Sequence, residues 1–171
     1  MSLLRRIDDV PVAQLAALFA DLKGGENGFG GTPVHAGELT VEAYVQECLA
    51  REVEAGLPPG RVPETHLVLV EDGEAAGLFR VRHRLNDALR LHGGHVGYYV
   101  RPAFRRRGLA RRALLEALEF LRGLGETRAL VTVDEHNAAS IGVVESCEGV
   151  LADTVFLEEH GVRAGRYWIQ L

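Results

Sequence analysis

Three consecutive arginines followed by a glycine form the part of the sequence with the clearest chemical meaning. The segment Arg105 to Ala110 lies between a predicted strand, Val96 to Val100, and a predicted helix. The first N–H groups of a helix have no partner inside the helix, and the helix dipole adds positive potential there, so such a turn attracts anions. Gly108 has no Cβ to hold phosphate oxygens away from the backbone, small Ala110 keeps the approach open, and the arginines supply neutralising charge. We therefore expect this turn to bind a diphosphate.

The simplest alternative is a solvated arginine cluster at the start of an ordinary helix. Arginines at a helix N-terminus oppose the dipole by roughly 0.3–1 kcal/mol each, so Arg105 to Arg107 would weaken the helix unless an anion lies among them. The turn also differs from two common nucleotide-binding loops, because no Lys-Ser or Lys-Thr follows Gly108 and its glycines do not follow the GxGxxG pattern. An anion site of another kind is therefore favoured.

Hydrophobic periodicity predicts several helices and strands around this turn. Apolar residues recur with helical spacing in some segments, and short apolar runs bounded by turn residues indicate strands. Asp72-Gly73 lies between two such runs, which is typical of a hairpin. The predicted elements are, in order, a helix over Val12 to Leu22, a helix from Val41 to Val53 capped by Thr40, strands over His66 to Val70, Ala76 to Leu85 and Val96 to Val100, a helix from Ala110 to Leu121, a strand over Ala129 to Val133, a short helix between Asn137 and Cys147, and closing strands over Val150 to Leu157 and Arg163 to Leu171.

Two segments outside the turn have a predicted place near a substrate. In the strand Ala76 to Leu85, inward-facing residues that include His83 alternate with arginines on a face predicted to be exposed. The segment Gly24 to Gly31 is too rich in glycine to predict a packed element, so we expect a mobile loop, and its Phe29 could close over a substrate with His83 beside it.

Composition limits the classes of protein that fit. The chain has 171 residues, and this length favours a single domain that spans residues 1–171. The sequence shows no apolar run long enough to cross a bilayer and no signal-peptide pattern, so we expect a soluble cytoplasmic protein without a membrane partner. Its cysteines, Cys48 and Cys147, form no metal-binding pair, and no metal site is predicted. A net charge of −5 disfavours general nucleic-acid binding.

The stretch from Val100 to Ala110 resembles motif A of the GNAT N-acetyltransferases, in which R/Q-x-x-G-x-G/A follows a strand. Here the matching residues are Arg105, Gly108 and Ala110. The resemblance extends over about residues 64–171 and includes Asn137 and Ser140, which match the family's N-x-x-S/A. It implies an α+β fold with a central mixed sheet of about six to seven strands flanked by about four helices. In that fold, the strands Val96 to Val100 and Ala129 to Val133 would splay apart.

The resemblance also implies a cofactor and a reaction. Acetyl-CoA would bind as a cosubstrate, without a metal, and its acetyl group would pass to an amine by direct attack in a ternary complex. The implied cofactor-binding residues are Val100, Arg105, Arg106, Arg107, Gly108, Leu109, Ala110, Asn137 and Ser140. The thioester would lie near Tyr98 and Val100.

Catalytic roles are less well defined. The family often has a tyrosine seven residues after the asparagine as the proton donor to the thiol, but here that position is Val144. Tyr98 is our substitute, with a buried tyrosine of structural role as the alternative. His83 and His95 are candidate bases, each of which could instead be a structural histidine. Asn137 is a candidate catalytic residue or a helix cap, and Cys147 is disfavoured as an acyl carrier.

The acceptor is not identified by the sequence. A small-molecule or peptide amine fits, and a homodimer is allowed. We expect the loop Gly24 to Gly31, the hairpin end His83 to Asn86 and the closing strands to form the acceptor pocket. A non-catalytic acyl-CoA-binding module is the main alternative, favoured by Val144, and a nucleic-acid-binding domain using the arginines is a second.

Overall fold

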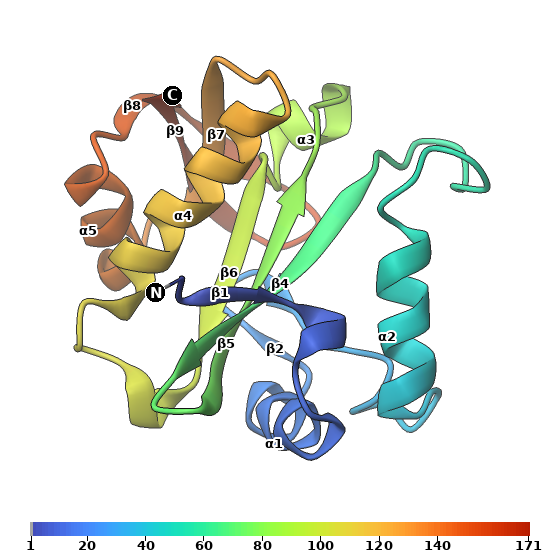
Figure 1. The fold of residues 1–171 in the computed structure, drawn as a ribbon. Coiled ribbons are helices and arrows are strands. Elements are labelled where there is room, and N and C mark those ends of the chain that lie inside the picture. The colour runs from blue at the N-terminus through green and yellow to red at the C-terminus, as the bar shows by residue number, and fades with distance from the viewer. Residues whose placement is uncertain (1) are drawn as a thin grey trace.

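The structure is a computed structural model in which residues 2–171 are described, and they form an α+β fold (Figure 1). The α-helices are α1 (Val12–Leu22), α2 (Val41–Ala50), α3 (Asp87–Leu91), α4 (Leu109–Gly123) and α5 (Ala138–Ser146), and the 3-10 turns are η1 (Ile7–Asp9) and η2 (Pro102–Phe104). The strands are β1 (Leu4–Arg6), β2 (Gly25–Glu26), β3 (Phe29–Gly30), β4 (Glu64–Glu71), β5 (Glu74–Arg82), β6 (Val96–Val100), β7 (Arg128–Asp134), β8 (Val150–Leu157) and β9 (Val162–Gln170).

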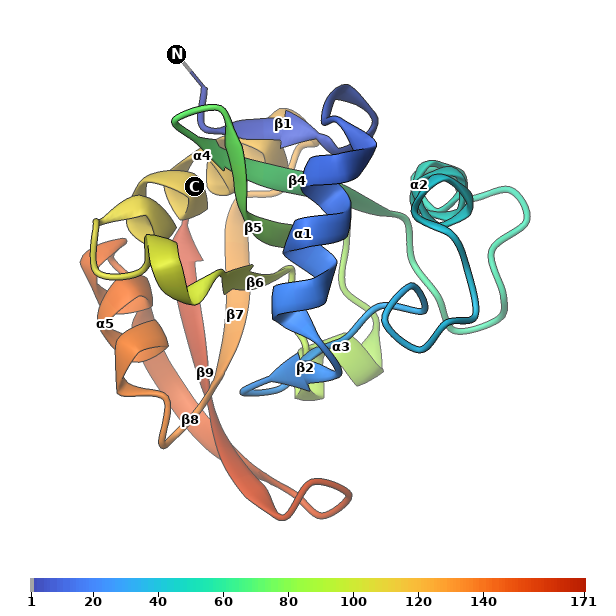
Figure 2. The ribbon, with the colours of Figure 1, turned by 90° about the horizontal axis from the view of Figure 1, so that it is seen from below.

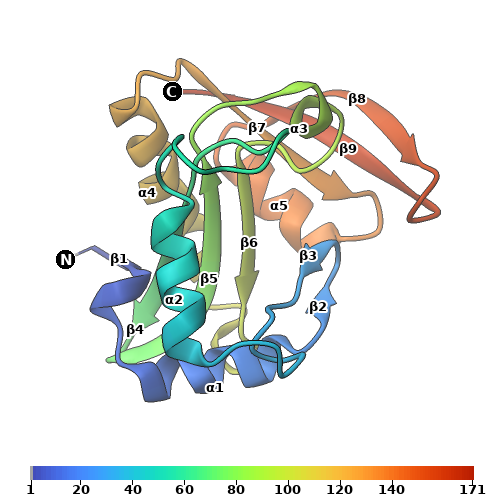
Figure 3. The same ribbon diagram turned by 90° about the vertical axis from the view of Figure 1, so that its right-hand side faces the viewer.

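The longer strands form two antiparallel sheets. Four strands have the order β1-β4-β5-β6 and three have the order β7-β9-β8. The edge strands β6 and β7 meet at one end, where the backbone N–H of His95 donates to the carbonyl of Leu130 at 2.7 Å. Beyond that point they diverge (Figure 3). The strands of the expected central sheet are therefore present, and the sheet is divided between β6 and β7.

Helices cover both faces of the four-stranded sheet (Figure 2). Helices α1 and α2 pack on one face through a core that includes Phe19, Tyr44 and Leu78. Helix α4 packs on the other face through a core that includes Phe79 and Leu114. Leu78 and Phe79 contribute to different cores because successive side chains of a strand point to opposite faces.

Local signals in the sequence explain where several elements begin and turn. Helix α1 has the predicted bounds. The Thr40 hydroxyl accepts a hydrogen bond from the first turn of α2 at 3.2 Å, which confirms the predicted cap. Asp72 and Gly73 have φ values of 52° and 80°, the left-handed pair that a two-residue hairpin turn needs.

Other element ends differ from the prediction. Helix α2 ends at Ala50, because the Arg51 carbonyl accepts a hydrogen bond from the N–H of Glu64 at 3.0 Å, which joins the end of the helix to the start of β4. Val53 lies outside the helix and is 56% exposed. Strand β5 stops at Arg82, before the predicted Leu85. The short elements β1 and α3 were not predicted from the sequence.

The glycine-rich segment expected to be a mobile loop forms a small hairpin instead, made of β2 and β3. Its turn residues Asn27 and Gly28 have φ values of 48° and 81°. Phe29 is 9% exposed, its ring lies 4.3 Å from the guanidinium carbon of Arg80, and it stacks on Tyr99 at 6.3 Å between ring centres. The prediction was wrong because Phe29 anchors the segment to the sheet and the Asn-Gly turn supplies the required backbone conformation.

None of the helices within residues 2–171 combines the length and the apolar character needed to cross a bilayer. Over the same residues, no group of three or more His, Cys, Asp or Glu side chains is arranged to hold a metal ion.

Candidate functional site

The turn between β6 and α4 presents a row of unused backbone donors. Gly108, the residue before α4, has a φ of 72°, and no side chain caps the helix. The first backbone hydrogen bond into the helix is donated by Arg112, to the Gly108 carbonyl at 3.3 Å. Within residues 2–171, none of the N–H groups from Arg106 to Arg111 donates a hydrogen bond. A Cβ built on Gly108 would meet no atom within 4 Å, so the space beside this glycine is open.

The three arginines of the turn have different environments. Arg105 donates through Nε to the Val100 carbonyl at 2.8 Å and pairs with the carboxylate of Glu26 in the hairpin at 2.6 Å. Arg107 pairs with Glu71 at 3.2 Å and with Asp72 at 3.1 Å. Arg106 has a left-handed φ of 62° and forms no ion pair among the described residues. Arg105 therefore stabilises the conformation of the turn, and Arg106 is the arginine of the three whose charge has no ion-pair partner among the described residues.

The apolar residues of the turn belong to the core. Val100 and Leu109 are 9% and 2% exposed, and both pack in the core under α4. Ala110 is partly buried against the same core. These side chains fix the position of the backbone, and only their backbone groups are placed to contact a ligand.

The edge of β6 offers backbone groups next to this turn. β6 pairs with β5 on one side only, so its second edge has no strand partner along Val96–Val100. His95 marks the point where β6 and β7 separate: its Nδ1 accepts from the N–H of Leu130 at 2.9 Å, and its ring is 2% exposed. Burial lowers the pKa of His95 to about 4. His95 therefore joins the two sheets as a neutral structural histidine.

Tyr98, Ser140 and Asn137 form one connected group between β6 and α5. The Tyr98 hydroxyl lies 2.7 Å from Ser140 Oγ, and the Ser140 N–H donates to Asn137 Oδ1 at 3.1 Å, which caps α5. Tyr98 stacks on Phe79 with ring centres 5.2 Å apart. Burial raises the pKa of Tyr98 to about 12, although the hydrogen bond to Ser140 acts in the other direction. Three of the predicted site residues are thus brought together.

His83 lies apart from this group and from Phe29. Its Nε2 lies 2.8 Å from the Thr65 hydroxyl, and its ring packs at 6.1 Å from that of Phe120 in α4. Phe29 packs on Arg80, on the opposite face of β5. The expectation that His83 and Phe29 are neighbours was wrong. Phe29 contacts the face of β5 that bears Arg80, whereas His83, the residue after β5, packs toward α4 on the other side of the sheet.

The β5 face predicted to be exposed is largely covered. Arg80 donates to the carbonyls of Gly30 and Gly31 at 3.0 and 3.1 Å, and Arg82 donates to the Gly93 carbonyl at 2.9 Å. Both arginines are only partly exposed. Sequence spacing placed them correctly on one face but could not show that the hairpin and the segment before β6 would cover that face.

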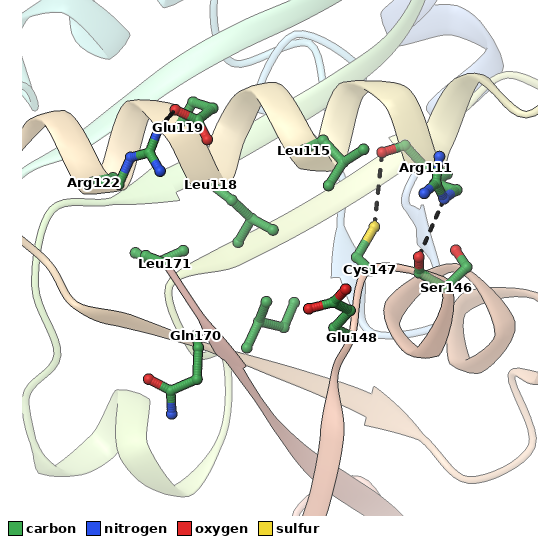
Figure 4. Close-up of a pocket in the computed structure, with 11 residues that line it drawn as sticks. Arg111, Leu115, Leu118, Glu119, Arg122, Ser146, Cys147, Glu148, Gln170 and Leu171 are labelled. Atoms are coloured by element: carbon green, nitrogen blue, oxygen red, sulfur yellow. Dashed lines mark hydrogen bonds and ion pairs between the residues drawn. The ribbon is translucent and has the colours of Figure 1, made fainter.

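Neither Val144 nor Cys147 is placed to take part in the reaction. Val144 is fully buried in the core. The Cys147 thiol points to the Arg111 carbonyl at 3.8 Å, in a separate pocket of about 240 Å³ between α4, α5 and the end of β9 (Figure 4). Burial raises the pKa of Cys147, which disfavours a thiolate. Asp134 uses its carboxylate locally, accepting from the N–H of His136 at 2.8 Å.

Comparison with known proteins places the chain in a family. A model of the acetyltransferase (GNAT) family matches residues 38–148. No curated protein matches the chain.

Solved structures share the fold at low sequence identity. RimJ from Mycobacterium smegmatis in complex with CoA-disulfide is 20% identical, with a TM-score of 0.70 over 98% of this chain and 80% of that one. The ribosomal-protein-alanine N-acetyltransferase from Brucella melitensis is 19% identical, with a TM-score of 0.68 over 99% and 100%. YncA from Salmonella typhimurium with its cofactor acetyl-CoA is 19% identical, with a TM-score of 0.66 over 98% and 92%. Because the family model covers more than half of the 171 residues, this chain belongs to the GNAT family of acetyltransferases.

Proposed function

We propose that the chain transfers an acetyl group from acetyl-CoA to an amine acceptor by direct attack in a ternary complex. The observation that carries this proposal is the row of unpartnered N–H groups from Arg106 to Arg111, which follows directly on a strand with an open edge. A diphosphate can accept several such bonds at a helix N-terminus. The amides of a pantetheine arm can pair with an open strand edge in the way an added strand does.

Several residues of the turn would hold the cosubstrate. The backbone from Arg106 to Arg111 would bind the diphosphate, with the Arg106 guanidinium as the free cation. Val100 would contribute backbone groups of the β6 edge, and Arg105 would keep the turn in place through its bond to the Val100 carbonyl. Asn137 and Ser140 would position α5 and the Tyr98 hydroxyl across from β6.

The acceptor must lose a proton for the reaction to proceed. An amine with a pKa near 10.4 is neutral in only about one molecule in 2,500 at pH 7, which costs about 4.6 kcal/mol. His95 is sequestered between the sheets, and the His83 ring is engaged with Thr65. We therefore assign proton removal to water in the acceptor site. The neutral nitrogen then forms the C–N bond, the C–S bond breaks, and the CoA thiolate takes up a proton.

Tyr98 fits the role of a hydrogen-bond donor to the leaving sulfur better than that of its proton source. Its pKa is raised to about 12 by burial, whereas a thiol has a pKa near 8.5, so complete transfer of the tyrosine proton would be uphill by about 5 kcal/mol. The departing thiolate would instead be protonated by solvent. The expected loss on Tyr98→Phe is therefore small, about three- to tenfold in kcat.

A non-catalytic acyl-CoA-binding module is the second candidate. Val144 favours it, because this buried side chain cannot donate a proton at the position where the family often has a tyrosine.

A thiol-release assay with acetyl-CoA and a broad panel of amines tests the two candidates. We expect acceptor-dependent release of CoA thiol by the wild type and a lower kcat/KM for Asn137→Ala. Loss of the cap alone should cost about 0.5–2 kcal/mol of stability, so urea unfolding of the same variant separates a kinetic effect from a structural one. Tight CoA binding without thiol release for any amine would support the binding module and contradict catalysis.

A further inference from the structure

A second pocket, of about 300 Å³, lies between the segment that joins α2 to β4 and the region around α3. Its charged lining consists of the three arginines Arg51, Arg61 and Arg82 and one acid, Glu64. Figure 3 shows the segment after α2 passing beside α3. The pocket is on the same side of the four-stranded sheet as α2, and it is separate from the turn before α4.

Hydrogen bonds hold the walls of this pocket together. Asn86 Nδ2 donates to the Gly60 carbonyl at 2.9 Å, and its Oδ1 caps α3. The N–H of Glu64 donates to the Arg51 carbonyl at 3.0 Å, and that of His83 to the Pro63 carbonyl at 2.8 Å. Because both walls are joined by backbone and side-chain bonds, a ligand would enter a largely preformed site.

Positive charge exceeds negative charge in the pocket. Arg51 lies 3.6 Å and Arg82 lies 3.9 Å from the Glu64 carboxylate, and Arg51 also pairs at 3.1 Å with Glu47, which lies outside the pocket lining. Arg61 forms no ion pair or side-chain hydrogen bond among residues 2–171, although it lines the same space. Burial lowers the pKa of Arg82, and the neighbouring cations Arg80 and Arg61 lower it further, while Glu64 acts in the other direction. An anion in the pocket would relieve this imbalance.

Arg82 connects the pocket to the proposed path of the cosubstrate. Arg82 lines the pocket, and its Nη1 lies 4.0 Å from the position of a Cβ on Gly97, the second residue of β6. Since β6 is the strand whose open edge would receive the pantetheine arm, we expect a group bound at Arg82 to lie on the side of the pocket that is nearer to that strand. The remaining lining includes the apolar residues Leu57, Val62 and Leu89, which suit a short hydrocarbon part of a ligand.

We infer that this pocket binds the carboxylate of the acceptor, so that the acceptor is a small amino-carboxylate of the amino-acid type. A guanidinium recognises a carboxylate through parallel hydrogen bonds. Arg61, which has no side-chain partner among residues 2–171, is the group able to provide them, and Arg82, whose Nη1 donates to the Gly93 carbonyl, adds positive charge. The amine of such a compound is separated from the carboxylate by few bonds and would extend past Arg82 toward Gly97. This inference rests on the proposed acetyl transfer.

Paired acceptors test the inference directly. Leucine, methionine, phenylalanine and glutamate are each compared with the corresponding C-terminal amide, which keeps the amine and removes the charge of the α-carboxylate. For at least one amino acid, we expect kcat/KM about tenfold or more above that of its amide, because the amide leaves the Arg61 guanidinium without an anionic partner. Equal values for all pairs would overturn the inference.

Two variants test whether the preference for a carboxylate arises in this pocket. Arg61→Gln should raise the KM of the preferred amino acid by about tenfold, while the KM of its amide and that of acetyl-CoA stay within about twofold. Arg90→Gln removes the same charge from an exposed position on α3 outside the pocket and should change none of them. An equal effect of the two variants would contradict a site at Arg61.

Calorimetric titration of the same amino acids into the CoA-bound protein separates failure of this inference from failure of the proposed function. Binding that Arg61→Gln weakens, together with no thiol release for any amine, would contradict acetyl transfer and support the carboxylate site. Turnover of amines without discrimination between acid and amide would support acetyl transfer and overturn the carboxylate site.

Discussion

Arg106 is the arginine of the turn whose charge remains available to a ligand. Arg105 is bound to the Val100 carbonyl and to Glu26, and Arg107 is paired with Glu71 and Asp72. Phosphate binding by Arg105 or Arg107 would have to compete with these ion pairs. The two ends of the triplet therefore contribute mainly to the shape of the turn.

We predict that Arg106→Gln weakens CoA binding by about tenfold, because a charge-assisted hydrogen bond is worth about 1.5–3 kcal/mol before its own costs. Arg107→Gln is the matched control and should weaken binding by less than about threefold. Calorimetry with CoA at low and moderate salt measures both, and the salt dependence should flatten in the Arg106 variant. Equal losses of CoA affinity in the two variants would show that Arg106 contributes no more to phosphate binding than Arg107 does.

The sequence predicted the turn but not the roles of its arginines. Arg105, Gly108 and Ala110 follow a pattern that depends on spacing along the chain, and local spacing is what a sequence shows. The partners of Arg105 and Arg107 lie in the hairpin and in the β4–β5 turn, far away in sequence. His83 was misplaced for the same reason, since its neighbour Phe120 belongs to another element.

At the scale of single elements, β4 has a buried histidine that makes no hydrogen bond. His66 is fully buried, and both of its ring nitrogens lack a partner among the described residues. The nearest carboxylate, that of Glu64, is 3.8 Å from Nε2, and Tyr44 of α2 packs edge-on against the ring. Burial lowers the pKa of His66 to about 4, while Glu64 opposes that shift and Arg80 adds to it.

This histidine should make stability depend on pH. An unfolded histidine has a pKa near 6.5, so the folded pKa is the lower of the two, and the contribution of the neutral ring is complete above about pH 6.5 and is lost as the pH falls toward about 4. We predict that the free energy of unfolding decreases between pH 7.5 and pH 5, and that His66→Leu reduces this decrease by about 1–2 kcal/mol. Part of the decrease should remain, because the pKa of His95 is lowered in the same direction.

Urea unfolding at the two pH values measures this difference. His136→Leu is the control, since the side chain of His136 is 81% exposed. An identical pH dependence in the wild type and in His66→Leu would contradict the assignment of a neutral buried ring.

The hairpin of β2 and β3 was only partly predictable from the sequence. Asn27-Gly28 is a strong hairpin signal of the same kind as Asp72-Gly73, but the strands β2 and β3 have two residues each and give no periodic pattern. Their stability comes from Phe29 on the sheet and from the Glu26 pair with Arg105. Such contacts between distant segments are not visible in a local pattern.

At the scale of the whole molecule, one four-stranded sheet separates two cores. The face under α4 supports the turn and the group around Tyr98, and the face under α1 and α2 supports the hairpin and the arginine pocket. β6 has neighbours from both faces and ends at the turn, so it lies between the two proposed binding regions. The order of the long elements was predictable from hydrophobic periodicity. The division between β6 and β7 and the arginine pocket depend on pairing between distant segments and were not.

We propose that the turn at Gly108 holds the diphosphate of CoA, and a comparison of two glycine variants tests this assignment. Gly108→Glu places a carboxylate in front of the unpartnered N–H groups, whereas Gly125→Glu adds the same charge just beyond the other end of α4. Both glycines have left-handed φ values, 72° and 95°, and neither has an atom within 4 Å of an added Cβ, so the cost in backbone strain, about 1–2 kcal/mol, should be similar.

Calorimetric titration with CoA, after circular dichroism has shown that both variants are folded, is therefore the most direct measurement. We predict that Gly125→Glu binds CoA within about threefold of the wild type. Gly108→Glu should lose about a hundredfold or more in affinity, because the new carboxylate occupies the anion site and repels the diphosphate. A folded Gly108→Glu variant that binds CoA as well as Gly125→Glu does would contradict the assignment of the cofactor site.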